Sequence, residues 1–172
     1  MTHLFLFTIG PVQSFIAQAR KTRDLYAGSR ILSDLVREGT KSFEESGGKI
    51  IFPHGQSPSQ PNRFLGQIDD NNPELTISLE DLGKRVEAAV KREWKTIAYK
   101  AIKGLMPPDG FDQQIDLALE TFWVFHPASE SAYHQAYRDI ERVLGAIKNV
   151  RPVRQYHYQQ ENGMTIYGER GR

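Results

Sequence analysis

The sequence predicts an α+β fold of the ferredoxin-like, split βαβ type, enlarged by extra helices. Two observations lead to this prediction. Short apolar, β-prone runs and longer segments of helical periodicity follow one another in the order strand, two helices, strand, strand, helix, strand, helix. The 172 residues, 39% hydrophobic and 25% charged, are enough for one complete core. We therefore expect one domain over residues 1–150, followed by a basic and aromatic tail over 151–172 that leads toward a further domain.

The first strand is predicted over residues 4–9, an apolar run that is rich in Phe and too short for a helix. A Gly-Pro pair then turns the chain, and Pro11 suits the first position of a helix. Apolar residues recur at helical spacing from there to Ala19, and a second helix is predicted over 24–46. Because helix N-termini attract anions, the start of the first helix is a candidate phosphate site.

The middle of the chain is predicted to form a β-hairpin and a long helix. The two strands span residues 49–53 and 62–68, with a loop of Gly, Ser, Gln and Pro between them. Ser78, with Asp81 three residues later, resembles a capping box and begins a strongly periodic helix to about residue 102. A short helix, a β-prone strand and a last helix follow, over residues 112–119, 121–125 and 129–148.

The opening string resembles a known family. The resemblance lies in residues 10–16 (GPVQSFI), 19–25 (ARKTRDL), 27–29 (AGS) and Ser33. Shorter pieces continue it, namely residues 51–53 (IFP), 61–64 (PNRF), the Trp94 helix, 122–124 (FWV) and 148–151 (KNVR). The string closely resembles the opening of the large subunit of type III-B CRISPR effector complexes, the Cmr-type branch of the Cas-ten family.

This resemblance implies that the chain is the first palm domain of that subunit, with the architecture of polymerase and nucleotide cyclase palms. In the family two palms face each other, and the second, which bears Gly-Gly-Asp-Asp, condenses ATP into cyclic oligoadenylates once target RNA is bound. ATP, with Mg²⁺ or Mn²⁺, is therefore expected only where the second palm is present. The implied partners are the other Cmr protein subunits, the guide RNA and the target RNA, in antiviral defence.

Catalytic and metal-binding residues are not expected in this chain. The sequence has no Gly-Gly-Asp-Asp, and a palm that transfers nucleotides needs carboxylates for two metal ions. The first strand ends in Thr8, the hairpin loop 53–62 has no acid, and we interpret Asp69 and Asp70 as a solvated turn. The five histidines lack metal-ligand spacing, no His-Asp dipeptide indicates an HD nuclease site, and the absence of cysteine excludes thiolate sites.

Binding residues are expected in two places. The candidate nucleotide contacts are Gln13, Ser14, Arg20, Lys21, Arg23 and Ser29. Arginine offers a planar fork to phosphate and lysine a point charge, although Arg20 is also spaced to pair with Asp24 at i,i+4. The candidate RNA or subunit contacts are Asn62, Arg63, Arg151, Arg154 and Tyr156. Alternatively, the first two of these residues cap the hairpin and the others lie in an exposed tail.

A free-standing ferredoxin-like RNA-binding module is the alternative function. Such modules expose aromatic residues on central strands, and Phe5, Phe7, Trp123 and Phe125 lie on two strands that we expect to be neighbours. However, we expect helices to cover one sheet face, and no RNP string is present. A stand-alone cyclase is disfavoured by the missing carboxylates.

Membrane association is not expected. No stretch approaches about 18 consecutive apolar residues, and residues 1–9 lack the layout of a signal peptide. We therefore expect a cytoplasmic protein. The net charge of +1 does not by itself indicate nucleic-acid binding.

Overall fold

The computed structural model describes residues 1–17, 19–53, 59–150, 156–159 and 165–168. Its centre is an antiparallel sheet with the strand order β2-β3-β1-β4. These strands are β1 (Thr2–Gly10), β2 (Lys49–Phe52), β3 (Arg63–Asp69) and β4 (Glu120–Pro127). The helices are α1 (Val12–Ala17), α2 (Thr22–Glu44), α3 (Leu79–Ala101), α4 (Phe111–Ala118), a 3₁₀ turn η1 (Glu130–Ala132) and α5 (Tyr133–Asn149). The predicted α+β class is confirmed.

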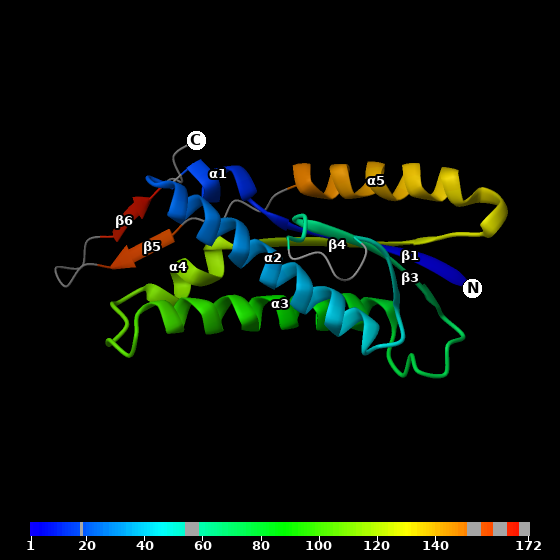
Figure 1. The fold of residues 1–172 in the computed structure, drawn as a ribbon, viewed down its shortest axis with the longest axis horizontal. Coiled ribbons are helices and arrows are strands. Elements are labelled where there is room, and N and C mark those ends of the chain that lie inside the picture. Colours follow the sequence, from blue (N-terminus) through cyan, green and yellow to red (C-terminus); the bar gives the residue numbers. More distant parts are fainter. Residues whose placement is uncertain (18, 54–58, 151–155, 160–164, 169–172) are drawn as a thin grey trace.

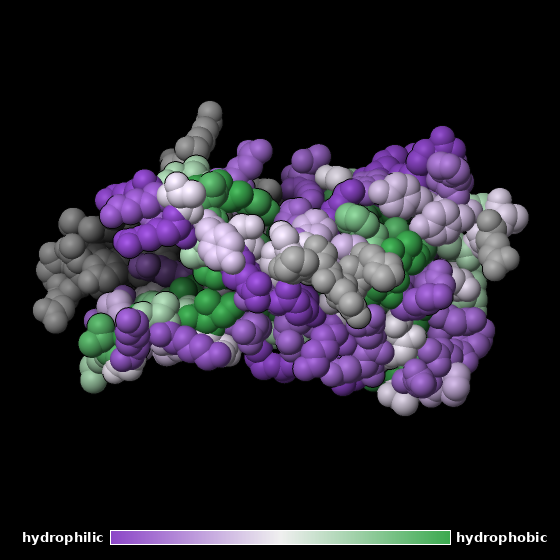
Figure 2. Space-filling view, viewed as in Figure 1, coloured by the Kyte–Doolittle hydropathy of each residue, from purple (hydrophilic) through white to green (hydrophobic). Residues whose placement is uncertain are grey.

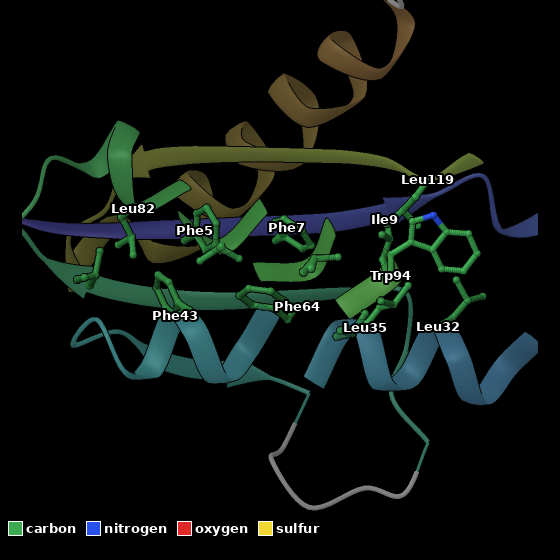
Figure 3. Packing of buried hydrophobic residues seen from close by; sticks show 14 residues of the cluster. Phe5, Phe7, Ile9, Leu32, Leu35, Phe43, Phe64, Leu82, Trp94 and Leu119 are labelled. Atoms are coloured by element: carbon green, nitrogen blue, oxygen red, sulfur yellow. The ribbon is translucent and has the colours of Figure 1, made fainter. Parts of the chain in front are cut away.

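One face of the sheet is covered by α2 and α3, as Figure 1 shows. The register places Phe7 of β1 opposite Phe64 of β3 and Trp123 of β4, so aromatic side chains gather on this face. Phe5 stacks on Phe43 of α2 with ring centroids 4.8 Å apart, and these buried rings form the centre of the core (Figure 3). Gly66 makes room for the Phe43 ring, because a Cβ there would lie 2.3 Å from Cε1 of that ring.

The opposite face of the sheet is covered by α5 (Figure 1). Leu4 and Leu6 point to this side because side chains alternate along β1, and they pack with residues of β3, β4 and α5. The buried members from α5 are Ala136, Ile140 and Leu144. Helices therefore cover both sheet faces, whereas the sequence predicted a cover for only one of them.

This arrangement also closes the sheet to RNA. Phe5 and Phe7 are fully buried between the sheet and the helices, and Trp123 and Phe125 are packed against the same core. β1 and β4 are neighbours, as expected. An RNA-binding module of the RNP kind needs such rings exposed on the sheet surface, so the sheet-face route of the alternative function is not available.

Several element boundaries differ from the predicted ones. The first helix begins after Pro11 and has only 6 residues, Val12–Ala17, and the second already begins at Thr22. The last helix begins at Tyr133 and is preceded by the 3₁₀ turn. The tail contains two short antiparallel strands that its pattern did not predict, β5 (Tyr156–Gln159) and β6 (Thr165–Gly168).

Candidate functional site

The candidate nucleotide residues lie where α1 meets the start of α2, which we name the α1–α2 corner (residues 12–17 and 19–30). Figure 1 places this corner at one end of the molecule. Gln13, Arg20, Lys21, Arg23 and Ser29 are all exposed there, and Ser14 lies in α1. Arg20 and Lys21 fall between the two helices and Arg23 lies in the first turn of α2, so none of these three residues lies on α1.

The start of α2 is held by Asp24. Its Oδ2 accepts a hydrogen bond from the backbone N–H of Lys21 at 3.2 Å, which caps the helix. Its Oδ1 lies 3.5 Å from Nε of Arg23. Arg20 precedes the helix, so the i,i+4 geometry proposed for its pairing with Asp24 does not apply. Among the described residues no ion pair includes Arg20.

The predicted nucleotide residues do not all converge on one point. Arg23 and Ser29 are six residues apart in one helix, which separates them by about 120° around the axis of α2. A single small ligand on one side of α2 therefore cannot contact both side chains directly. Arg20 and Lys21 are consecutive residues in the short link between α1 and α2.

Ser33, the last residue of the opening string, has a structural role. It is buried, and its hydroxyl donates to the carbonyl oxygen of Ser29 at 3.0 Å. Oγ of Ser33 also accepts a hydrogen bond from the backbone N–H of Gln60 at 3.1 Å. Ser33 thus fastens α2 to the segment that leads into β3.

Asn62 and Arg63, predicted to contact RNA or other subunits, make contacts within the chain. The Asn62 carbonyl accepts hydrogen bonds from the backbone N–H of Ile9 at 2.9 Å and from Oγ1 of Thr8 at 3.2 Å. Its side-chain amide donates to the Ile9 carbonyl at 3.2 Å. These bonds fasten the start of β3 to the end of β1, so Asn62 contacts the neighbouring strand rather than the hairpin loop.

Arg63 ties β3 to α5. Its Nη1 donates to Oε1 and Oε2 of Glu141 at 2.9 and 3.2 Å, and the Tyr137 hydroxyl donates to the same Oε1 at 2.9 Å. The hydrogen bond to Glu141 raises the pKa of Tyr137, and burial raises it further. Arg63 is only partly exposed, so it offers less to an RNA phosphate than a free arginine would.

The predicted contacts of the tail are described only in part. Arg151 and Arg154 lie outside the described residues. Tyr156 begins β5, where its backbone pairs with Gly168.

The acidic residues that the structure describes do not gather into a metal site. In the part of the chain that the structure describes, no three His, Asp or Glu side chains lie close enough to hold a metal ion together. Asp69 ends β3 and Asp70 follows in an exposed turn, as predicted. Oδ1 of Asp69 lies 3.0 Å from the N-terminal nitrogen of Met1, which also contacts Asp70.

A cavity of ≈ 280 Å³ lies between α3 and α4, lined by Lys91, Trp94, Asp116 and Leu119. Its charged groups already have partners, because Lys91 contacts Glu87 and Asp116 contacts Lys95. The charged groups that line the cavity are therefore already neutralised within the chain.

Sequence reasoning missed Tyr26, which is 71% exposed on α2. The signal was its spacing, because Tyr26 follows Arg23 by three residues and precedes Arg30 by four. Residues at these spacings share one face of a helix.

Within the described ranges, no helix has the length and apolar character that a membrane crossing requires.

Comparisons with known proteins gave one family match and a similar solved structure. Residues 4–58 match the family model described as CRISPR-associated protein Cmr2, N-terminal. This match supports the likeness to the N-terminal region of the Cmr2 large subunit. Among solved structures, the adenylyl cyclase CyaB from P. aeruginosa is similar at a TM-score of 0.42 and 13% identity, over 96% of this chain and 89% of that chain. No curated protein matches the chain.

Proposed function

We propose that this chain is the non-catalytic first palm of a Cmr-type large subunit in an RNA-guided antiviral effector complex. The observation that carries the proposal is the Cmr2 N-terminal match over residues 4–58. That segment includes nearly all of β1, the whole of α1, α2 and β2, and therefore the exposed α1–α2 corner. The proposed partners are the other Cmr subunits, and through them the guide and target RNA.

The strand order supports the palm assignment. β1 lies between β3 and β4 and is antiparallel to both, and each long connecting helix, α2 or α3, joins two strands that are not neighbours. This is the order of a ferredoxin-like, split βαβ domain. In the proposal, α5 is an addition that covers the second sheet face.

The proposal assigns catalysis and metal binding to the second palm. β1 has Thr8 near the end where a catalytic palm needs a carboxylate, and the Thr8 hydroxyl is buried and donates to Asn62. Magnesium prefers carboxylate ligands, so the described residues of this chain do not fit the metal.

This chain would supply cations to an ATP site at the palm interface. Arg20 and Lys21 are exposed in the link between α1 and α2, with Gln13, Ser14 and Ser29 on the adjoining helices. Arginine and lysine side chains of this kind neutralise triphosphate charge. Arg23 lies on a different side of α2 from Ser29, so the proposed ATP contacts do not include Arg23.

A titration with fluorescent ATP and Mg²⁺ tests the proposal, with the chain mixed with a palm that bears Gly-Gly-Asp-Asp. We expect saturable binding to the mixture that is tighter than binding to that palm alone and is displaced by unlabelled ATP. Arg20→Ala should weaken it, whereas Arg142→Ala on α5, another exposed arginine, should not. Equal binding with and without the chain would contradict the proposal.

A further inference from the structure

The outward side of α2 presents an aromatic ring between two arginines. Tyr26 is 71% exposed, and the side chains of Arg23 and Arg30 are 79% and 50% exposed. Their spacing of three and four residues places all three on one face of the helix. In Figure 2 hydrophilic side chains predominate along the outward side of α2.

This face is opposite the one that α2 buries. Leu32, Leu35, Val36 and Phe43 form the buried stripe of the helix, and the helical repeat places Arg23 and Arg30 on the other side of the axis. Tyr26 therefore makes no contribution to the core. Within the described part of the chain its hydroxyl has no hydrogen-bond partner.

Over residues 23–37 the charges of α2 are positive in balance. Asp34 is shared by Arg30, at 3.3 Å, and Arg37. Oδ1 of Asp24 lies 3.5 Å from Nε of Arg23. Oδ2 of Asp24 accepts the backbone N–H of Lys21 and so caps the helix. Two aspartates thus serve three arginines, and Arg20 and Lys21 extend the positive charge beyond the helix start.

We propose that Arg23, Tyr26 and Arg30 form a binding site for single-stranded RNA. A base stacks on the Tyr26 ring, and the phosphates on either side of it contact the two guanidinium groups. Aromatic rings bind unpaired bases by stacking, and arginines neutralise the backbone, which is the combination that single-stranded nucleic acids need.

A strand fits this face better than a mononucleotide does. The outer side of a helix is convex, whereas small ligands require concave sites that enclose them. Arg23 and Arg30 are separated by about 10 Å along the helix axis, a spacing at which a strand can contact both. Paired RNA is disfavoured because its bases are not free to stack on a side chain.

The site is independent of the proposed ATP interface, since it uses neither Arg20 nor the second palm. It also differs from the sheet-face and tail sites predicted from the sequence. The sheet aromatics are buried, so the exposed ring of α2 takes the role that a strand aromatic has in other RNA-binding modules.

The test is fluorescence anisotropy of a labelled, unstructured RNA of about ten nucleotides with the 172-residue chain at increasing salt. We expect Tyr26→Ala to weaken binding about tenfold, and Tyr26→Phe to keep it, because the phenyl ring still stacks. Arg23→Gln and Arg30→Gln should each reduce the slope of log K against log salt by about 0.7.

Matched controls lie on α5. Tyr133→Ala removes a tyrosine that is 39% exposed, and Arg142→Gln removes an arginine whose side chain is 80% exposed. Both variants should bind RNA with the affinity of the wild type. Circular dichroism should show the same thermal unfolding for all variants.

Three results would overturn the proposal. They are the absence of RNA binding, wild-type affinity in Tyr26→Ala, and equal losses in the control variants. Displacement of the RNA by ATP at equal concentration would overturn the assignment to a strand. If the chain does not tighten ATP binding by the second palm, the proposed function fails, but the RNA-binding result still stands.

Discussion

Glu87 links α3 to β4 through a small polar network. Nε1 of Trp123 donates to its Oε2 at 3.0 Å, and Nζ of Lys91 contacts its Oε1. Burial raises the pKa of Glu87, but the hydrogen bonds from Lys91 and Trp123 lower it by more, so the pKa lies below its usual value of 4.5. The folded state therefore favours the ionised form.

This network predicts a pH-dependent effect of Glu87→Gln. A carboxyl group whose pKa is lowered by folding stabilises the protein above its unfolded pKa, and the stabilisation is lost as the pH falls through the folded pKa. We expect the variant to be less stable than the wild type by about 1 kcal/mol at pH 7. Urea unfolding at pH 7 and at pH values below about 4 should show the difference shrinking with acidity. A difference that is constant with pH would contradict the role of the charge.

The sequence identified the charged residues of the corner but not their partners. Arg20 and Asp24 have the right spacing for a pair within one helix, yet the helix begins after Arg20. Asp24 instead caps the helix and approaches Arg23. Spacing predicts a side-chain pair only when both residues lie in the same helix, and helix boundaries are the least certain part of a sequence-based prediction.

At the scale of elements, α3 packs very closely against β4. Gly83 of α3 is buried beneath the Trp123 ring, and a Cβ at Gly83 would lie 2.5 Å from Cε3 of that ring. The close approach brings Glu87, one helical turn along, within reach of Nε1 of Trp123. Glycine is therefore required at this position by packing rather than by backbone conformation.

Gly83→Ala should destabilise the protein by about 1–3 kcal/mol, because the ring must shift in a packed core. This effect opposes the gain of up to about 1 kcal/mol that alanine usually brings to a helix. Gly145→Ala in α5 is the matched control, since nothing lies within 4 Å of a Cβ there. We expect that control to be neutral or stabilising in urea unfolding. A stabilised Gly83→Ala variant would contradict the packing.

The strongest element predictions came from local signals. Ser78 begins α3 as predicted, and its Oγ accepts the backbone N–H of Asp81 at 3.1 Å. The long periodic helices and the β2–β3 pairing are likewise confirmed. β5 and β6 were missed because strands of only 4 residues are too short to give a clear periodic signal.

At the scale of the whole molecule, the position of α5 decides which surfaces remain open. Its apolar stripe predicted that one face of the helix is buried, but such a stripe does not say against which side of a sheet. α5 packs on Leu4, Leu6 and Val124, opposite α2 and α3. The sheet is therefore enclosed, and the exposed binding residues are left at the α1–α2 corner and along α2.

The most direct test of the account is oligoadenylate synthesis by an assembled Cmr complex whose large subunit contains this domain. We predict that Arg20→Ala lowers the rate about tenfold, the effect of losing one charged hydrogen bond to phosphate, while RNA binding by the complex is unchanged. Arg142→Ala should leave the rate as in the wild type. Wild-type synthesis in Arg20→Ala would contradict the assignment of an ATP half-site to this corner.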